Sequence, residues 1–351
     1  MDHQSALADP PAGQPETAAG VPAAARRIYN SAVVTFAAAA AIDLGLFDAV
    51  RGASTVDLDQ FILDRDLHPG TVRGIVSTLA AADLVVSGPG HTRVAAGPGF
   101  DGMDAARPFV LWLVRGNGSL LASLAARARN ERPPDSAGRD EWGRDMTAVA
   151  RSASIASELY FDPVLEEALR EVEFTTAVDL GCGDGARLAK LARARPAMSG
   201  VGVDISPVAV RAARQRAAQA GVADRLRFRR DDVTSLTPDP ECDRADLLMC
   251  FLMGHDLWPR PGAVRTLSRL RQVFPHARNF ILCDECRPPE PLSLDNTVFT
   301  LGFMLVHAAM EKTIPTIEQW QGVFADSGWR CVRTLRSGVP ESNVLFHLQP
   351  S

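Results

Sequence analysis

Residues 175–185 of the 351-residue chain read TTAVDLGCGDG, and this stretch decides the fold. The apolar run that opens it is typical of a buried strand in a parallel sheet. Three glycines at alternate positions follow, and then comes a helical pattern, ARLAKLARA. Glycine lets the main chain turn tightly and approach a ligand, and the amide groups of a following helix attract polar or negative groups. The stretch therefore predicts a nucleotide-binding unit of strand, turn and helix.

Two further predicted strands are followed or ended by carboxylates. GVGVD ends at Asp204, where a carboxylate at the tip of a second strand can accept both hydroxyls of a ribose. RLRFRRDDV places Asp232 just past a third strand, where it can face an adenine amino group. We expect the cofactor to contact Asp179, Gly181, Gly183, Asp204, Ile205, Asp232, Val233 and Phe251.

In this order and spacing, VDLGCGDG, GVGVDIS and RFRRDDV resemble the motifs of class I S-adenosylmethionine (SAM) methyltransferases. The resemblance implies a Rossmann-like α/β domain that binds SAM. The alternative is a nicotinamide-dinucleotide domain, but the glycine spacing here is GxGxG and not GxGxxG. ADLLMCFLM and NFILCDE follow as a fourth and a fifth strand, and WRCVRTL and SNVLFHLQ as an antiparallel pair, which predicts seven strands.

Composition limits the partners and the compartment. The net charge of −5 gives no strong basic field, which argues against a nucleic-acid partner. The apolar run near residues 33–42 is too short to span a bilayer, so we expect no membrane partner. The six cysteines are scattered, which is typical of reduced thiols and favours a cytoplasmic location.

The chain before the glycine turn is mainly helical by pattern. The helix expected over 25–50 is apolar almost all round, which predicts burial between the subunits of a homodimer. A helix over 69–82 and a wing, SGPGHTRVA, follow in a winged-helix arrangement, but the helix carries too few cations for DNA binding. We predict a disordered tail, a mainly helical winged-helix dimerisation domain, a helical linker and lid, and a catalytic domain, over residues 1–24, 25–102, 103–172 and 173–351 respectively.

Two of the seven histidines are expected near the transferable methyl group. His255 lies on the loop after the fourth strand, and His307 lies on the helix after the fifth. A histidine on an apolar helix is more often packed in a core than bound to a ligand. However, MCFLMGHDLWP together with VFTLGFMLVHAAMEKTIPTIEQW resembles the α-keto acid C-methyltransferases that act on phenylpyruvate or 4-methyl-2-oxopentanoate. These enzymes make precursors of β-methyl amino acids for peptide natural products, including antibiotics.

This resemblance implies that His255 and His307 hold a non-haem iron or a zinc ion, while the 2-oxo acid fills two further positions. A metal on the substrate carbonyl would act as a Lewis acid and stabilise the enolate whose C3 takes the methyl group. Asp256 would orient an imidazole, act as the base or bind a water on the metal, and the sequence does not choose among these roles. Arg139 and Arg144 are candidates for the substrate carboxylate, and Trp112 lies in an apolar segment expected to favour an apolar substrate.

Two alternatives stay open. A metal-independent O-methyltransferase would use His255 as the general base that takes a proton from a hydroxyl. The O-methyltransferases have an HDW sequence at this loop, from which HDLW departs by the inserted Leu257. A SAM-sensing transcription regulator would use the winged helix to bind DNA, and salt-dependent DNA binding would reveal it.

Overall fold

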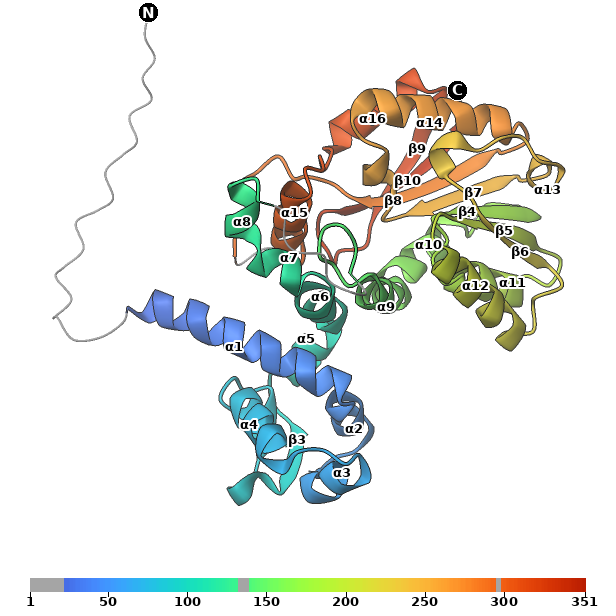
Figure 1. The fold of residues 1–351 in the computed structure, drawn as a ribbon. Helices are drawn as coiled ribbons and strands as arrows, with labels where there is room; N and C mark the ends of the chain where they lie inside the picture. Colours follow the sequence, from blue (N-terminus) through green and yellow to red (C-terminus); the bar gives the residue numbers. More distant parts are fainter. Residues whose placement is uncertain (1–21, 132–138, 295–297) are drawn as a thin grey trace, which may run out of the picture.

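The computed structural model describes residues 22–131, 139–294 and 298–351. A helical N-terminal region leads into an α/β domain (Figure 1). Most of the expected tail, 1–24, lies outside the described residues, and helix α1 begins at Ala23. Part of the polar loop expected over the site, 132–138, also lies outside them.

The α/β domain is built on the predicted seven-stranded sheet, in the order β6-β5-β4-β7-β8-β10-β9. Neighbouring strands from β6 to β8 run parallel, and β10 pairs antiparallel with β8 and with β9. This is the Rossmann-like class I methyltransferase fold, and it confirms the fold class expected from the sequence. The strands are β4 (Thr176–Leu180), β5 (Ser199–Asp204), β6 (Leu226–Arg230), β7 (Leu247–Phe251), β8 (Asn279–Glu285), β9 (Trp329–Arg336) and β10 (Asn343–Pro350).

Both faces of the sheet are covered by helices, so its central strands are buried on both sides (Figure 1). Along β4, Val178 and Leu180 face one core and Ala177 faces the other. Leu267 of α14 and Trp320 of α16 belong to the first core, and α10, α11 and α12 supply the second. These helices are α10 (Asp162–Ala168), α11 (Ala186–Ala194), α12 (Pro207–Gln219), α14 (Arg260–Val273) and α16 (Ile317–Asp326). Short elements follow β6 and β7, namely η4 (Val233–Ser235), α13 (Pro240–Asp243) and η5 (Gly254–Leu257).

The N-terminal region has the predicted wing, but the single helix expected over 25–50 is divided into two helices by a turn at Leu44 and Gly45, where Gly45 takes a φ of 77°. Its small sheet has the order β1-β3-β2, and β2 and β3 are the two strands of the wing. The helix in the recognition-helix position, α4, ends at Ala80, two residues before the expected end. The elements are α1 (Ala23–Asp43), α2 (Leu46–Gly52), β1 (Val56–Asp57), α3 (Leu58–Asp64), α4 (Pro69–Ala80), β2 (Val85–Ser87), η1 (Pro89–His91), β3 (Arg93–Ala96) and α5 (Phe100–Ala105).

Short helices connect the two halves of the chain and lie over the carboxyl ends of the strands. Helix α15 packs against η2 and α7 through an apolar cluster that includes Trp112, Leu120 and Phe303. This packing places α15 beside the connecting helices although the two are far apart in sequence. The elements are α6 (Arg107–Leu111), η2 (Trp112–Gly116), α7 (Gly118–Ala122), α8 (Leu124–Ala128), α9 (Met146–Ala156), η3 (Ser157–Phe161) and α15 (Thr300–Ala309).

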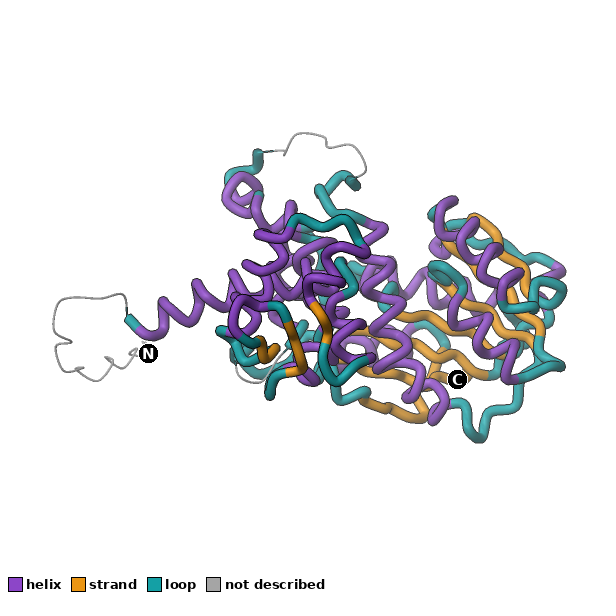
Figure 2. The backbone as a smooth tube through the Cα atoms, turned by 90° about the horizontal axis from the view of Figure 1, so that it is seen from below, coloured by secondary structure: helices purple, strands orange, loops and turns teal. Residues whose placement is uncertain are grey.

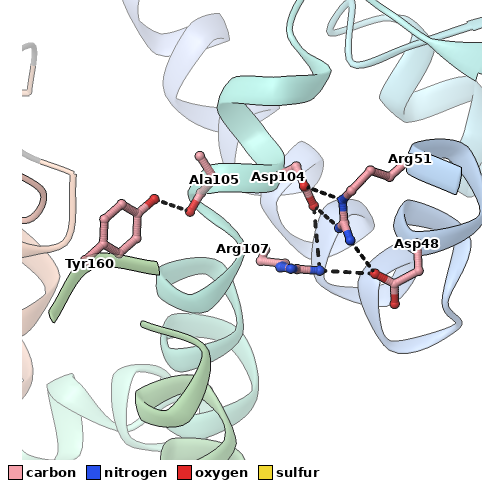
Figure 3. Close-up of polar contacts among 6 residues, drawn as sticks. All are labelled: Asp48, Arg51, Asp104, Ala105, Arg107 and Tyr160. Carbon is pink, nitrogen blue, oxygen red and sulfur yellow. Dashed lines mark hydrogen bonds and ion pairs between the residues drawn. The ribbon is translucent and has the colours of Figure 1, made fainter. Parts of the chain in front are cut away.

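Polar contacts fix the N-terminal region to the connecting helices (Figure 3). The Arg51 guanidinium donates from Nε to Asp104 Oδ2 at 2.7 Å, and an Arg107 nitrogen lies 3.8 Å from the same carboxylate. The Tyr160 hydroxyl donates to the carbonyl of Ala105 at 2.6 Å. The winged-helix region is therefore tied by side chains to the helices that border the site.

Within the described ranges, no single helix is both long enough and apolar enough to cross a membrane. The bent pair α1 and α2 reaches that length and apolarity only when both helices are taken together.

Candidate active site

The glycine turn after β4 has a shape that only glycine allows at two positions. Gly181 and Gly185 have φ angles of 73° and 72°, in the left-handed region. A Cβ on Gly181 would lie 3.2 Å from Met253, and one on Gly185 would lie 2.8 Å from Phe228. The turn therefore brings the main chain close to its neighbours and keeps the strand end open to a ligand.

Asp204 connects the glycine turn to the end of β5. Its Oδ2 accepts from the Gly183 amide at 2.9 Å, and its Oδ1 accepts from the Ser206 amide at 2.8 Å. Two amide donors hold the carboxylate in place, and each oxygen keeps a further lone pair for a ligand hydroxyl. The adjacent Ile205 side chain is 65% exposed, as an apolar wall of an open ligand site would be.

Asp232 follows β6 as expected, but it is engaged locally. Its Oδ1 accepts from the amide and from the hydroxyl of Thr234, both at 2.8 Å, and so caps η4. Val233 is buried beside it. The structure places both residues at the same edge of the sheet as Asp204.

Asp179 is fully buried at the end of β4. Burial raises the pKa of its carboxyl to about 6, although the nearby Arg187 guanidinium works in the opposite direction. Arg187 was not anticipated from the sequence. Its guanidinium carbon lies 3.6 Å from the ring centroid of Phe251, another residue expected to contact the cofactor.

His255 lies on η5, directly after β7, and is held by one carboxylate. Its Nδ1 lies 2.7 Å from Asp284 Oδ1, and its main-chain amide donates to Asp284 Oδ2 at 2.6 Å. Burial lowers the pKa of this imidazole, but the attraction of Asp284 outweighs burial and the pKa is raised overall. Asp284 thus fixes the ring and leaves Nε2 as its other polar atom.

His307 lies on α15 and is held by a main-chain carbonyl. Its Nδ1 lies 2.7 Å from the carbonyl oxygen of Phe303, one turn earlier. Burial, followed by repulsion from His255, lowers its pKa to about 3. The ring is therefore neutral near pH 7, and because Nδ1 must donate to the carbonyl, Nε2 carries a lone pair.

The two histidines meet in one cavity. Their ring centroids lie 4.8 Å apart and the rings cross at 89°. Both line a cavity of about 170 Å³ that is bordered mainly by apolar and aromatic side chains. The other lining residues are Pro108, Phe109, Trp112, Arg144, Met146, Val149, Ser152, Ala153, Ala156, Phe161, Leu252, Asp256, Phe299 and Phe303.

Not all of the residues predicted to act on the substrate line this cavity. Trp112, Arg144 and Asp256 line the cavity with the histidines. Arg139 does not line it, and its guanidinium lies 3.5 Å from the carbonyl of Gly143. The Arg139 side chain turns back onto its own loop. It is therefore not placed to bind a substrate in the cavity, although the sequence suggested this role.

The sequence did not single out Asp284, although one signal was present. NFILCDE was recognised as a strand, and a carboxylate at the carboxyl end of a parallel strand is well placed for function. It also did not single out Lys312, whose Nζ lies 3.4 Å from Asp256 Oδ1. That contact joins the end of α15 to the loop that carries His255.

The two imidazoles of the cavity are the candidate metal ligands. Among the residues described, no cluster of three or more histidine, cysteine or acidic side chains is arranged to hold a metal. Neither Nε2 of the histidine pair forms a hydrogen bond to any described residue, while each Nδ1 is engaged. That donor arrangement is the usual one for imidazoles that bind a metal, so the pair fits a metal whose other ligands come from a substrate or solvent.

The sheet order, the glycine turn and the carboxylate at the tip of β5 define a class I SAM-dependent methyltransferase. A family model described as a methyltransferase domain matches residues 177–275. The chain is 36% identical over 332 residues to methyltransferase ungE′ of Aspergillus campestris (strain IBT 28561), covering 92% of this chain and 95% of that protein. The chain therefore belongs to the methyltransferase family.

Two other likenesses extend over nearly the whole chain. Indolepyruvate C-methyltransferase of Streptomyces griseus is 27% identical over 322 residues, covering 90% of this chain and 92% of that protein. The crystal structure of LaPhzM superposes with a TM-score of 0.69 at 18% identity, covering 94% of this chain and 100% of that one. This structural likeness shows that the N-terminal helical region and the α/β domain of this chain have the same fold as the matched structure.

Proposed function

We propose that this methyltransferase transfers the methyl group of SAM to C3 of an apolar 2-oxo acid. The observation that carries the proposal is the pair His255 and His307, with ring centroids 4.8 Å apart in a largely apolar cavity. The similarity to an indolepyruvate C-methyltransferase supports it, because indolepyruvate is itself a 2-oxo acid. Amination of the product would give a β-methyl amino acid, a building block for peptide natural products.

In this proposal, His255 and His307 hold an iron or a zinc ion, both of which suit imidazole ligands. The Asp284 carboxylate and the Phe303 carbonyl engage the Nδ1 atoms, so each Nε2 is the donor to the metal. When bound, the metal supplies Lewis-acid polarisation of the substrate carbonyl, which makes the neighbouring C3–H more acidic.

The cavity side chains orient the substrate. Arg144 presents a guanidinium whose Nε is 2.8 Å from Asp140 Oδ2, so its position is fixed before the substrate arrives. We assign it the substrate carboxylate, since a guanidinium can donate to both oxygens at once. Trp112, Phe299 and Phe303 receive the apolar side chain and exclude water from C3.

The reaction breaks the C3–H bond and the bond between sulfur and methyl. The proton goes to a base, the C3 electron pair takes the methyl group, and the sulfonium leaves as a neutral thioether. Asp256 borders the cavity and its side chain is 51% exposed, so it is the candidate base. The orienting role also considered for it is already performed for His255 by Asp284.

Metal-independent O-methylation is the second candidate, and a specific observation favours it. His255 is paired with a buried carboxylate, and the pairing raises its pKa. An imidazole of this kind is a suitable general base for a hydroxyl proton. In this case His307 would only line the pocket.

A metal measurement combined with a substrate panel tests the proposal. The purified protein is analysed for iron and zinc, and then incubated with SAM and phenylpyruvate, 4-methyl-2-oxopentanoate or indolepyruvate. We expect about one metal per chain and a product methylated at C3, located by carbon NMR with a labelled methyl donor. Full activity on a hydroxylated acceptor after exhaustive metal removal would instead establish O-methylation.

We also propose that the enzyme is a homodimer joined through α1. The N-terminal half of this helix extends away from the rest of the chain (Figures 1 and 2), and Ile28, Tyr29 and Phe36 on it are each more than half exposed. A second copy would cover this apolar face. The winged-helix region would then serve assembly rather than DNA binding.

A further inference from the structure

Lys312 is held in place by the turn that ends α15. Its main-chain amide donates to the carbonyl oxygen of His307 at 2.9 Å, which closes the turn after the helix. The preceding residue, Glu311, has a φ angle of 57°, in the left-handed region where a residue with a side chain is uncommon. Such conformations often occur at functional sites, and here the turn gives the Lys312 side chain one defined starting point.

The Lys312 side chain reaches the loop that carries the other histidine of the cavity. Its Nζ lies 3.4 Å from Asp256 Oδ1, and Asp256 directly follows His255 on η5. The side chains of Lys312 and Asp256 are 37% and 51% exposed, whereas His255 and His307 are each 4% exposed. The ion pair therefore joins η5 to the end of α15 on the solvent side of the buried histidine pair.

Folding stability does not explain this ion pair, because a pair with this exposure contributes little to it. Asp256 borders the cavity, and among the described residues Lys312 is the only cationic side chain paired with it. A carboxylate at the edge of a cavity can turn toward solvent or toward a ligand, and an ammonium group on a fixed main chain restricts that choice. Because Nζ engages Oδ1, Oδ2 is left available to a ligand.

We propose that Lys312 is a positioning residue that holds the Asp256 carboxylate toward C3 of the substrate. This inference rests on the proposed C-methylation, in which Asp256 is the candidate base. The C3 proton moves to Asp256 Oδ2, and its electron pair stays on C3 to take the methyl group. Lys312 itself contacts neither the substrate nor the metal, and it acts by restricting the carboxylate to a productive orientation.

Exchange of the C3 protons for deuterium in D2O tests this inference, because exchange reports proton removal without methyl transfer. The purified enzyme is incubated with 4-methyl-2-oxopentanoate and with S-adenosylhomocysteine in place of SAM, and proton NMR follows the exchange above the uncatalysed rate. The wild type is compared with Lys312→Ala, Lys312→Arg and Lys190→Ala. Lys190 is the other lysine of the chain and lies 2.9 Å from Glu166, so it controls for the loss of an ion pair elsewhere.

We expect Lys312→Ala to slow both the exchange and kcat for methylation about 2- to 5-fold. Lys312→Arg should be close to the wild type, and Lys190→Ala should be unchanged. The metal content, the SAM affinity and the KM for 4-methyl-2-oxopentanoate should not change in Lys312→Ala, because Lys312 contacts none of these ligands. In an Asp256→Asn background, which lacks the base, Lys312→Ala should cause no further loss.

Several results would overturn the role of Lys312 alone. These are an unchanged exchange rate in Lys312→Ala, an equal loss in the Asp256→Asn background, a change confined to KM, and a loss of metal, which would make Lys312 a support of the histidine pair. If Asp256→Asn exchanges as fast as the wild type, Asp256 is not the base and the inference fails with that role. A wild type that neither exchanges C3 protons nor methylates a 2-oxo acid would refute the proposed function itself.

Discussion

The imidazole rings of His255 and His307 lie 4.8 Å apart and cross at 89°, although they belong to different elements, η5 and α15. Each ring is held from outside the pair, one by Asp284 and the other by the carbonyl of Phe303. Their meeting depends on the position of α15, which packs against the connecting helices and whose Thr300 hydroxyl donates to Glu285 Oε1 at the end of β8. The histidine pair is therefore a product of the fold and the centre of the proposed chemistry.

We predict that His255→Ala and His307→Ala lose metal to the same extent. Each substitution removes one of only two protein donors, so the metal content of both variants should fall, as should 2-oxo acid methylation. SAM affinity should survive, because the cofactor residues lie on other loops. Mass spectrometry of metal content and calorimetry with SAM would measure the two effects.

The exposed His276 offers a control, since His276→Ala should leave the metal content and the activity unchanged. Unequal losses in the His255→Ala and His307→Ala variants would contradict the metal proposal. If His255→Ala abolishes activity while His307→Ala causes only a modest loss, His255 acts as a base and His307 only lines the pocket.

Asp204→Ala should weaken SAM binding by roughly 1.5–3 kcal/mol, because the ribose hydroxyls lose a charged acceptor. The glycine turn also loses a support, since Asp204 accepts from the Gly183 amide. Calorimetry would measure the effect, with Asp224→Ala as an exposed control. An unchanged affinity would remove Asp204 from the cofactor site.

Phe36→Asp should convert a dimer to a monomer. Phe36 is 62% exposed on α1, and a charge there would be buried without a partner in the interface. Light scattering at micromolar concentration would report the mass. Leu63→Asp, at a position on α3 that is 73% exposed, should stay dimeric. A wild type that is already monomeric would contradict the proposed role of α1.

Glu285 should make the folded protein less stable as the pH rises. Burial raises the pKa of this carboxyl from 4.5 to about 7, and its Oε2 has no hydrogen-bond partner among the described residues. The folded state therefore binds a proton more tightly than the unfolded state between pH 4.5 and 7. This contribution to stability is present below pH 4.5 and is lost as the pH rises through 7.

Glu285→Gln should reduce the dependence of folding stability on pH. The amide keeps an oxygen for the Thr300 hydroxyl, which lies 2.8 Å from Glu285 Oε1, and it removes the buried charge. Relative to the wild type, the variant should gain up to about 3 kcal/mol between pH 5 and pH 8. Urea unfolding at both pH values measures the difference, and a gain that is the same at both would contradict the shifted pKa.

The sheet and its glycine turn were predictable because their signals are local. A buried parallel strand shows an apolar run, and a turn with positive φ at Gly181 and Gly185 shows glycine. The antiparallel pair β9 and β10 was also expected, from two strand segments joined by a short turn, and the structure confirms the pairing. In each case the pattern lies within a few residues of the element that it specifies.

The amino-acid sequence by itself determined the class I methyltransferase fold and located the two histidines. It did not reveal that Asp284 holds His255, that Arg187 faces Asp179, or that Arg139 turns away from the cavity while Arg144 lines it. These relationships were decided only by the tertiary structure. Side-chain partners from separate strands, helices and loops meet through packing over long sequence distances, and no local periodicity or spacing records which of them will face each other.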